Sequence, residues 1–161
     1  HWQSKENLYL AVYRQLFQEL TALAQEVTDL LEDGLHARKR LEEVIDPVTD
    51  RIFTFFDANR ELARLNLHRV LEDGALAIQI EEEFENPLYH AVARCYQRLN
   101  EEGLVKISDP ELLPFALESL LERYFASPVH VERSIGLNPE VLRMRLRNHF
   151  RETFLRLLKG D

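Results

Sequence analysis

Cysteine is almost absent from this sequence, since Cys95 is the only one. A single thiol cannot close a disulfide within one chain, which excludes the cross-linked framework of small secreted domains and fits a reducing cytoplasm. Because Cys95 has apolar neighbours on its predicted helix, we expect a buried, inert thiol rather than a redox sensor.

Long apolar runs are also missing. No stretch approaches the roughly 18 apolar residues that a membrane-spanning helix needs. We therefore expect a cytoplasmic protein with no membrane partner.

Hydrophobic residues make up 45% and charged residues 30% of the 161 positions, which is the balance of a globular chain rather than a disordered one. A chain of this length can form one domain with a sizeable core.

Positive charge is in deficit over most of the sequence. The 20 Lys and Arg residues are outnumbered by 28 Asp and Glu residues, which gives a formal net charge of −8. Nucleic-acid binding relies on clustered Lys and Arg, so this balance argues against DNA binding by these residues alone. The exception is the segment 138–161, where six basic residues outnumber three acidic ones.

Motifs for catalysis or metal binding are lacking as well. The six histidines, at positions 1, 36, 68, 90, 130 and 149, form no i,i+4 pair, and there is no Glu-x-x-His pair. No phosphate-binding glycine loop or Gly-x-Ser-x-Gly turn occurs. We therefore expect no enzyme, no metal and no cofactor.

The acidic run within 81–85 either attracts a cationic effector or, as such runs do more often, forms a solvated face.

The patterns that are present are helical. Asn86-Pro87, Ser108 to Glu111 and Asn138-Pro139 are typical helix starts, and Gly34, Gly74 and Gly103 are candidate helix ends. Residues 75–85 are either helix or loop, because their alternating apolar residues find no partner strand elsewhere. We predict an all-α fold with helices over about 5–31, 36–56, 57–74, 87–102, 109–126 and 138–158, the second kinked or broken by Pro47 near Asp46.

The first predicted helix organises the rest. Ser4 can cap it, and Leu8, Val12, Leu16 and Leu20 follow at i+4 spacing on one face. At 1.5 Å per residue the helix would be roughly 40 Å long, more than the width of a small domain. We expect it to form a spine along which the other helices pack.

The start of this helix carries a family resemblance. Residues 1–8 read His-Trp-Gln-Ser-Lys-Glu-Asn-Leu, which resembles the junction in TetR-family transcriptional regulators where a DNA-reading helix-turn-helix passes into the long fourth helix. The family's DNA-binding module would lie before His1 and is missing here. The resemblance implies that residues 1–8 are a remnant of this junction and that residues 9–161 form a ligand-binding and dimerisation domain. The matching residues are His1, Trp2, Ser4, Lys5, Glu6 and Leu8.

The resemblance implies an effector cavity among the helices. It would bind a small apolar or aromatic effector with a polar end. The alternative for each aromatic side chain is that it only packs in the core. The expected effector-binding residues are Tyr13, Phe17, Phe53, Phe56, His68, Tyr89 and Tyr96.

The resemblance also implies a homodimer in which the last two helices form a four-helix interface, and operator DNA bound through the missing module. His1 and Lys5 would lie near the DNA backbone; otherwise Lys5 is simply an exposed lysine. In the alternative to a dimer, the last two helices complete the core of a single chain. A helical protein-interaction module without a pocket remains the alternative function. The expected interface residues are Leu117, Leu121, Tyr124, Leu142, Leu146, Phe150 and Phe154.

Overall fold

The computed structural model describes residues 4–71 and 74–160. Within this part every regular element is helical, which confirms the predicted all-α fold. The elements are α1 (Lys5–His36), α2 (Leu41–Ala58), α3 (Arg60–Val70), α4 (Ala75–Ile80), the π-helix η1 (Glu81–Glu85), α5 (Asn86–Glu101), α6 (Leu113–Ala126), α7 (Pro128–Ile135) and α8 (Pro139–Lys159).

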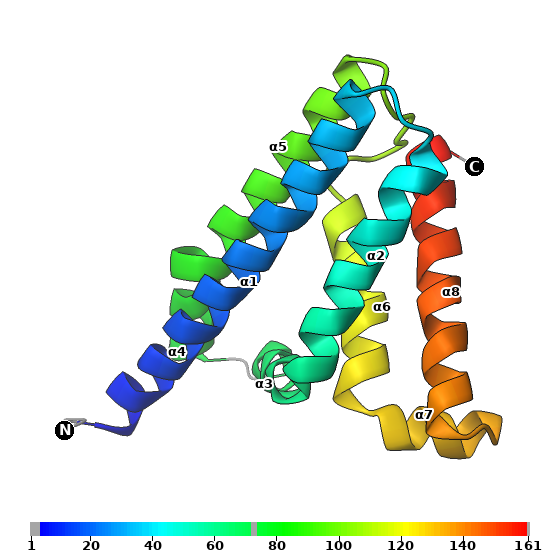
Figure 1. The fold of residues 1–161 in the computed structure, drawn as a ribbon. Helices are drawn as coiled ribbons and strands as arrows, with labels where there is room; N and C mark the ends of the chain where they lie inside the picture. The colour runs from blue at the N-terminus through cyan, green and yellow to red at the C-terminus, as the bar shows by residue number, and fades with distance from the viewer. Residues whose placement is uncertain (1–3, 72–73, 161) are drawn as a thin grey trace.

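Two groups of helices face each other. The long helix α1 runs beside α5, and α2, α6 and α8 stand opposite this pair (Figure 1). The short helix α3 lies near the end of α2, and α7 connects α6 to α8. The main core lies where the two groups meet, and a smaller apolar cluster lies around Tyr13, Phe17 and Ile80.

The spine helix begins as predicted but ends later. Ser4 caps it, since the backbone N–H of Asn7 donates to Ser4 Oγ at 3.2 Å. The prediction that Gly34 ends this helix is wrong, because Gly34 is buried inside α1. A Cβ at this position would lie 2.7 Å from a Val44 methyl carbon, so glycine is needed where α2 crosses α1 closely.

The second helix is not broken by its proline. α2 begins at Leu41, later than predicted, and continues through Pro47, so the predicted break near Asp46 is absent. Burial explains this continuity: Val44, Ile45 and Val48 lie in the core, so packing on both sides of the proline compensates for the lost backbone bond.

The segment from Ala75 to Glu101 is one continuous helical run with a wide turn in its middle. α5 begins at Asn86, but the chain does not leave the helical conformation there, since the N–H of Asn86 donates to the carbonyl of Glu81 in the π pattern. A π-turn next to Pro87 accommodates a residue that has no N–H to give to the helix. Gly74, a candidate helix end, lies instead at the start of α4. The third helix was predicted over 57–74 and is shorter in the structure, where it spans Arg60–Val70.

The last helices are separated by one element that the pattern did not predict. α6 begins at Leu113, after the Asp109 carboxylate accepts bonds from the N–H groups of Glu111 and Leu112 at 3.1 and 3.0 Å. The short helix α7 follows. α8 then begins as predicted, because Asn138 Oδ1 accepts from the N–H of Val141 at 2.9 Å.

Several basic side chains of α8 form ion pairs within the chain. These side chains face acidic side chains of α2: Lys159 pairs with Glu42 at 2.7 Å and Arg147 with Asp50 at 2.6 Å. Such exposed pairs contribute little to stability, and they lie where α8 packs against α2. The other two pairs of this row are Arg143–Asp57 and Arg151–Asp46.

None of the helices in the described residues combines the length and the apolar character needed to cross a bilayer.

Candidate ligand cavity

A cavity of about 160 Å³ lies between the two groups of helices. Helix α1 forms one wall with Leu20, Ala24 and Val27, and the lining is almost wholly apolar except at Glu85 and Glu118. The remaining lining residues are Phe17, Leu23 and Thr28 of α1, Ile52 and Phe56 of α2, Leu88, Tyr89, Val92 and Tyr96 of α5, Pro114, Leu117 and Leu121 of α6, and Phe150 and Phe154 of α8.

Four of the seven residues expected to bind an effector line this cavity: Phe17, Phe56, Tyr89 and Tyr96. They come from three different helices. These helices are α1, α2 and α5, whereas the lining residues of α6 and α8 were not among those expected to bind an effector.

The other three lie elsewhere. Tyr13 is fully buried in the smaller cluster, where its hydroxyl donates to the carbonyl of Leu65 at 2.9 Å. Phe53 packs in the core, with its ring centroid 5.2 Å from that of Phe125. His68 is exposed on α3.

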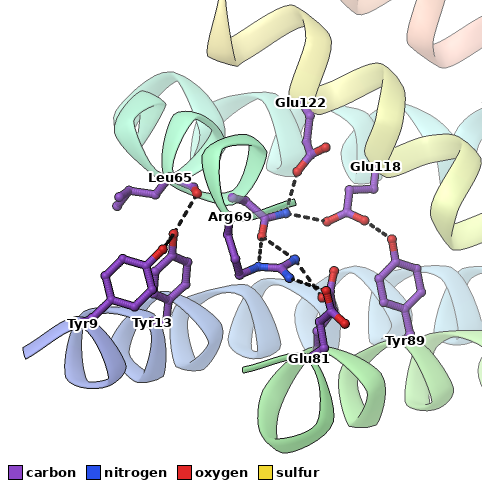
Figure 2. A network of polar contacts seen from close by, with 10 residues as sticks. Tyr9, Tyr13, Leu65, Arg69, Glu81, Tyr89, Glu118 and Glu122 are labelled. Carbon is purple, nitrogen blue, oxygen red and sulfur yellow. Dashed lines mark hydrogen bonds and ion pairs between the residues drawn. The ribbon is translucent and has the colours of Figure 1, made fainter. Parts of the chain in front are cut away.

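A network of polar side chains lies at the Glu85–Glu118 end of the cavity, around Arg69 of α3 (Figure 2). The Arg69 side chain is completely buried, and its guanidinium pairs with Glu81 at 3.1 Å and Glu85 at 2.7 Å. It also donates to Asn66 Oδ1 from Nε and Nη2. Buried charge is costly unless it is paired and hydrogen-bonded, and here Arg69 satisfies both conditions.

Glu118 of α6 connects this network to the cavity. Its carboxylate accepts from Asn66 Nδ2 at 3.0 Å and from the hydroxyl of Tyr89. Burial, followed by the nearby charges of Glu122 and Glu85, raises the pKa of Glu118 to about 8. At neutral pH this side chain is therefore mostly protonated, which is what a carboxyl group in a mainly apolar cavity requires.

The neighbouring carboxyl groups are perturbed in the same direction. Burial raises the pKa of Glu85 against the opposing effect of Arg69, and burial raises the pKa of Glu122 against the hydrogen bond from Asn66. The single guanidinium of Arg69 thus faces four carboxyl groups, those of Glu81, Glu85, Glu118 and Glu122. The polar end of the cavity therefore has an excess of acidic groups.

Helix geometry divides the acidic run within 81–85. Glu82 and Glu83 are exposed, and Glu83 pairs with Arg14 at 3.4 Å on the surface. Glu81 and Glu85 instead turn toward Arg69, and Glu85 reaches the cavity. The expectation of a solvated face therefore holds for Glu82 and Glu83 but not for Glu81 and Glu85.

No sequence pattern pointed to Arg69, Asn66 or Glu118 as site residues. A signal for two of them is present in outline, since Arg69 and Asn66 are polar residues three positions apart on one face of a helix. Their partners lie on α6 and η1, however, and only the fold brings these elements together.

The residues expected at a dimer interface are mostly buried within the chain. Leu117, Leu121, Leu142, Phe150 and Phe154 lie in the interior of the single chain. Tyr124 and Leu146 are half-buried.

Of the two residues expected near DNA, Lys5 is exposed in the first turn of α1. His1 lies outside the described residues.

The single thiol of the chain, Cys95, is buried. Burial raises the pKa of the Cys95 thiol to about 12, so the thiolate is negligible at neutral pH. Within residues 4–71 and 74–160, no group of three or more His, Cys, Asp or Glu side chains is arranged to hold a metal ion.

Comparison of the chain with known protein families, with curated proteins and with solved structures finds no match.

Proposed function

We propose that this chain is the effector-sensing and dimerisation part of a TetR-like DNA-binding transcriptional regulator. The observation that carries the proposal is the cavity itself, which is built against the spine helix α1 through Phe17, Ala24 and Val27. A ligand that enters it contacts the helix that, in the resemblance, leads directly to the DNA-reading module.

The proposed mechanism is a shift between two arrangements of α1. A ligand can change an equilibrium only by binding one arrangement better than the other. In dimeric helix-turn-helix proteins the two reading helices must be one turn of DNA apart, about 34 Å, so a displacement of a few ångströms is enough to weaken operator binding. The apolar wall on α1 is the place where an effector would favour one arrangement.

The proposed dimer would form through the outer faces of α6 and α8. The row Leu142, Phe150 and Phe154 is occupied by packing within the chain. Phe115 of α6 and Met144 of α8 remain about half exposed, at 52% and 54%. The mass of the chain in solution, measured by light scattering, should be that of a dimer, and a Met144→Asp variant should shift it toward the monomer; a monomeric parent chain would reject this part of the proposal.

The cavity is tested by filling it. Ala24 lines the cavity from α1, whereas Ala22 is exposed on the same helix. Small aromatic compounds should raise the melting temperature of the parent chain and of Ala22→Phe, but not that of Ala24→Phe. Equal shifts in all three proteins would place binding outside the cavity and reject the effector site.

The rival function is a helical protein-interaction module that uses no small molecule. It predicts that no compound raises the melting temperature. The DNA-binding part of the proposal has its own test, because the coding sequence upstream of His1 should encode a helix-turn-helix rich in Lys and Arg. An upstream sequence without one would reject the regulator while leaving the cavity as a binding site.

A further inference from the structure

The cavity joins an apolar body to an acidic end, and this combination selects a class of ligand. The body consists of aliphatic and aromatic side chains, including Phe17, Phe56 and Tyr96. The acidic end consists of Glu85 and Glu118, which line the cavity directly. A ligand that satisfies both regions has an apolar ring and a group that complements a carboxylate.

The positive charge of Arg69, at the acidic end of the cavity, is already paired with carboxylates of the chain. Arg69 directs its guanidinium to Glu81, Glu85 and the amide oxygen of Asn66. The hydrogen bonds recorded for Glu118 come from neutral groups, the Asn66 amide and the Tyr89 hydroxyl. Within the described residues, the network thus has more acidic groups than Arg69 can neutralise.

We propose that the cavity binds a lipophilic cation of about the size of one aromatic ring, with its ammonium group beside Glu118 and Glu85 and its ring among the apolar side chains. This inference rests on the proposed effector function and names the class of effector. From the sequence, the acidic run within 81–85 either attracts a cationic effector or forms a solvated face. In the fold, Glu85 of this run lines the cavity.

Size limits the ligand. A buried apolar cavity of about 150 Å³ accepts a benzene molecule, and the cavity here is about 160 Å³. It is also open toward solvent, so the part of the ligand that exceeds one ring need not be enclosed.

The aromatic ring of Tyr89 at the polar end adds to the selectivity. The Tyr89 ring lines the cavity next to Glu118 and stacks on Phe115 with centroids 3.8 Å apart, which fixes its orientation. A quaternary ammonium group is attracted to the face of such a ring and needs no hydrogen-bond acceptor. Neutral aromatic molecules gain the apolar contacts but not this attraction.

Binding of a cation should release a proton. The charged and titratable groups that face Glu118 are Glu122 on its own helix, Glu85 of η1, Arg69 of α3 and Tyr89 of α5. Without ligand, Glu118 retains its proton up to a pH of about 8. A cation placed beside it favours the carboxylate, so affinity should rise with pH until Glu118 ionises without help.

The test compares two ligands of the same shape, phenyltrimethylammonium and tert-butylbenzene, which differ in the charged nitrogen. Calorimetric titration should show that the cation binds about tenfold more tightly or better. Its affinity should increase by up to about tenfold per pH unit between about pH 6 and pH 8, because one proton is released for each ligand bound. Neither effect is expected for tert-butylbenzene.

Glu118→Gln removes one of the two carboxylates and retains the shape, so it should weaken both the preference for the cation and the pH dependence, to which Glu85 still contributes. Glu101→Gln is the matched control, because Glu101 is exposed at the far end of α5 and should behave like the parent chain. Thermal unfolding of each variant shows that it is folded.

If tert-butylbenzene binds as well as the cation, the cavity is a binding site but the inferred ligand class is wrong. If the cation binds equally to the parent and to Glu118→Gln, the acidic end does not recognise it, and the inference is again overturned. If neither compound binds at any pH, both this inference and the proposed effector cavity are rejected.

Discussion

Glu118 makes a pH-dependent contribution to stability that can be worked out from its surroundings. Its pKa rises from an ordinary 4.5 to about 8 in the folded chain. The folded state therefore holds a proton that the unfolded state has lost between these two pH values. Stability conferred by the protonated form is fully present below about pH 4.5 and falls as pH rises toward 8, by about 1.4 kcal/mol per unit.

The total loss is on the order of 5 kcal/mol, a large part of the stability of a domain of this size. The raised pKa values of Glu85 and Glu122 act in the same direction. Glu26 and Glu42 have lowered pKa values because of hydrogen bonds from Arg51 and Lys159, so their contributions are lost only at pH values below the usual range of Glu. Between about pH 5.5 and pH 8.5, Glu26 and Glu42 therefore do not change the pH dependence of stability that comes from Glu118.

The assay is chemical denaturation of the parent chain, Glu118→Gln and the exposed control Glu101→Gln across this pH range. Glutamine is neutral at every pH, so Glu118→Gln should become progressively more stable than the parent as the pH rises. The control should follow the parent. A constant difference between Glu118→Gln and the parent would mean that Glu118 is already ionised in the folded chain, and the description of the polar end would be wrong.

Three further changes test the packing of the fold. Gly34→Ala should reduce the free energy of unfolding by about 1–3 kcal/mol in urea denaturation, because the new Cβ would collide with Val44; an unchanged value would show that α1 and α2 separate freely. Thr49→Val should leave stability equal or raise it by about 1 kcal/mol, since the buried Thr49 hydroxyl has no hydrogen-bond partner among the described residues, and a clear loss in calorimetry would refute this. Asn138→Ala should cost about 1 kcal/mol by removing the cap of α8, seen as a lower melting temperature, whereas an unchanged melt would mean that the cap is dispensable.

Local chemistry was enough to predict most of the longer helices and two of their starts, but not the short helix α7. Ser4 and Asn138 cap helices through bonds to backbone N–H groups three residues away, so a short stretch of sequence contains both partners. The role of Gly34 could not be predicted in this way. Its lack of a side chain serves a contact with Val44 on another helix, and local patterns contain no information about that distance.

The candidate site was predictable only in part for the same reason. Of the residues expected to bind an effector, Phe17, Phe56, Tyr89 and Tyr96 line the cavity, whereas His68 of α3 does not, and the cavity walls on α6 and α8 were not expected. The acidic end depends on Glu118, whose proton affinity comes from burial, from Glu122 on its own helix and from neighbours on two other elements, η1 and α3. The row Leu142, Phe150 and Phe154 was ambiguous from the start, because an apolar row suits an intrachain core and a dimer interface equally well. The structure places this row in the core.

The central claim is that a ligand occupies the cavity against α1. Methyl NMR of the chain with phenyltrimethylammonium tests it most directly. The account predicts nuclear Overhauser effects between the ligand protons and the methyl groups of Leu20, Ala24, Val27 and Leu121, which line the cavity. Contacts confined to exposed methyl groups such as those of Leu71 and Ile78, or no contacts at all, would contradict it.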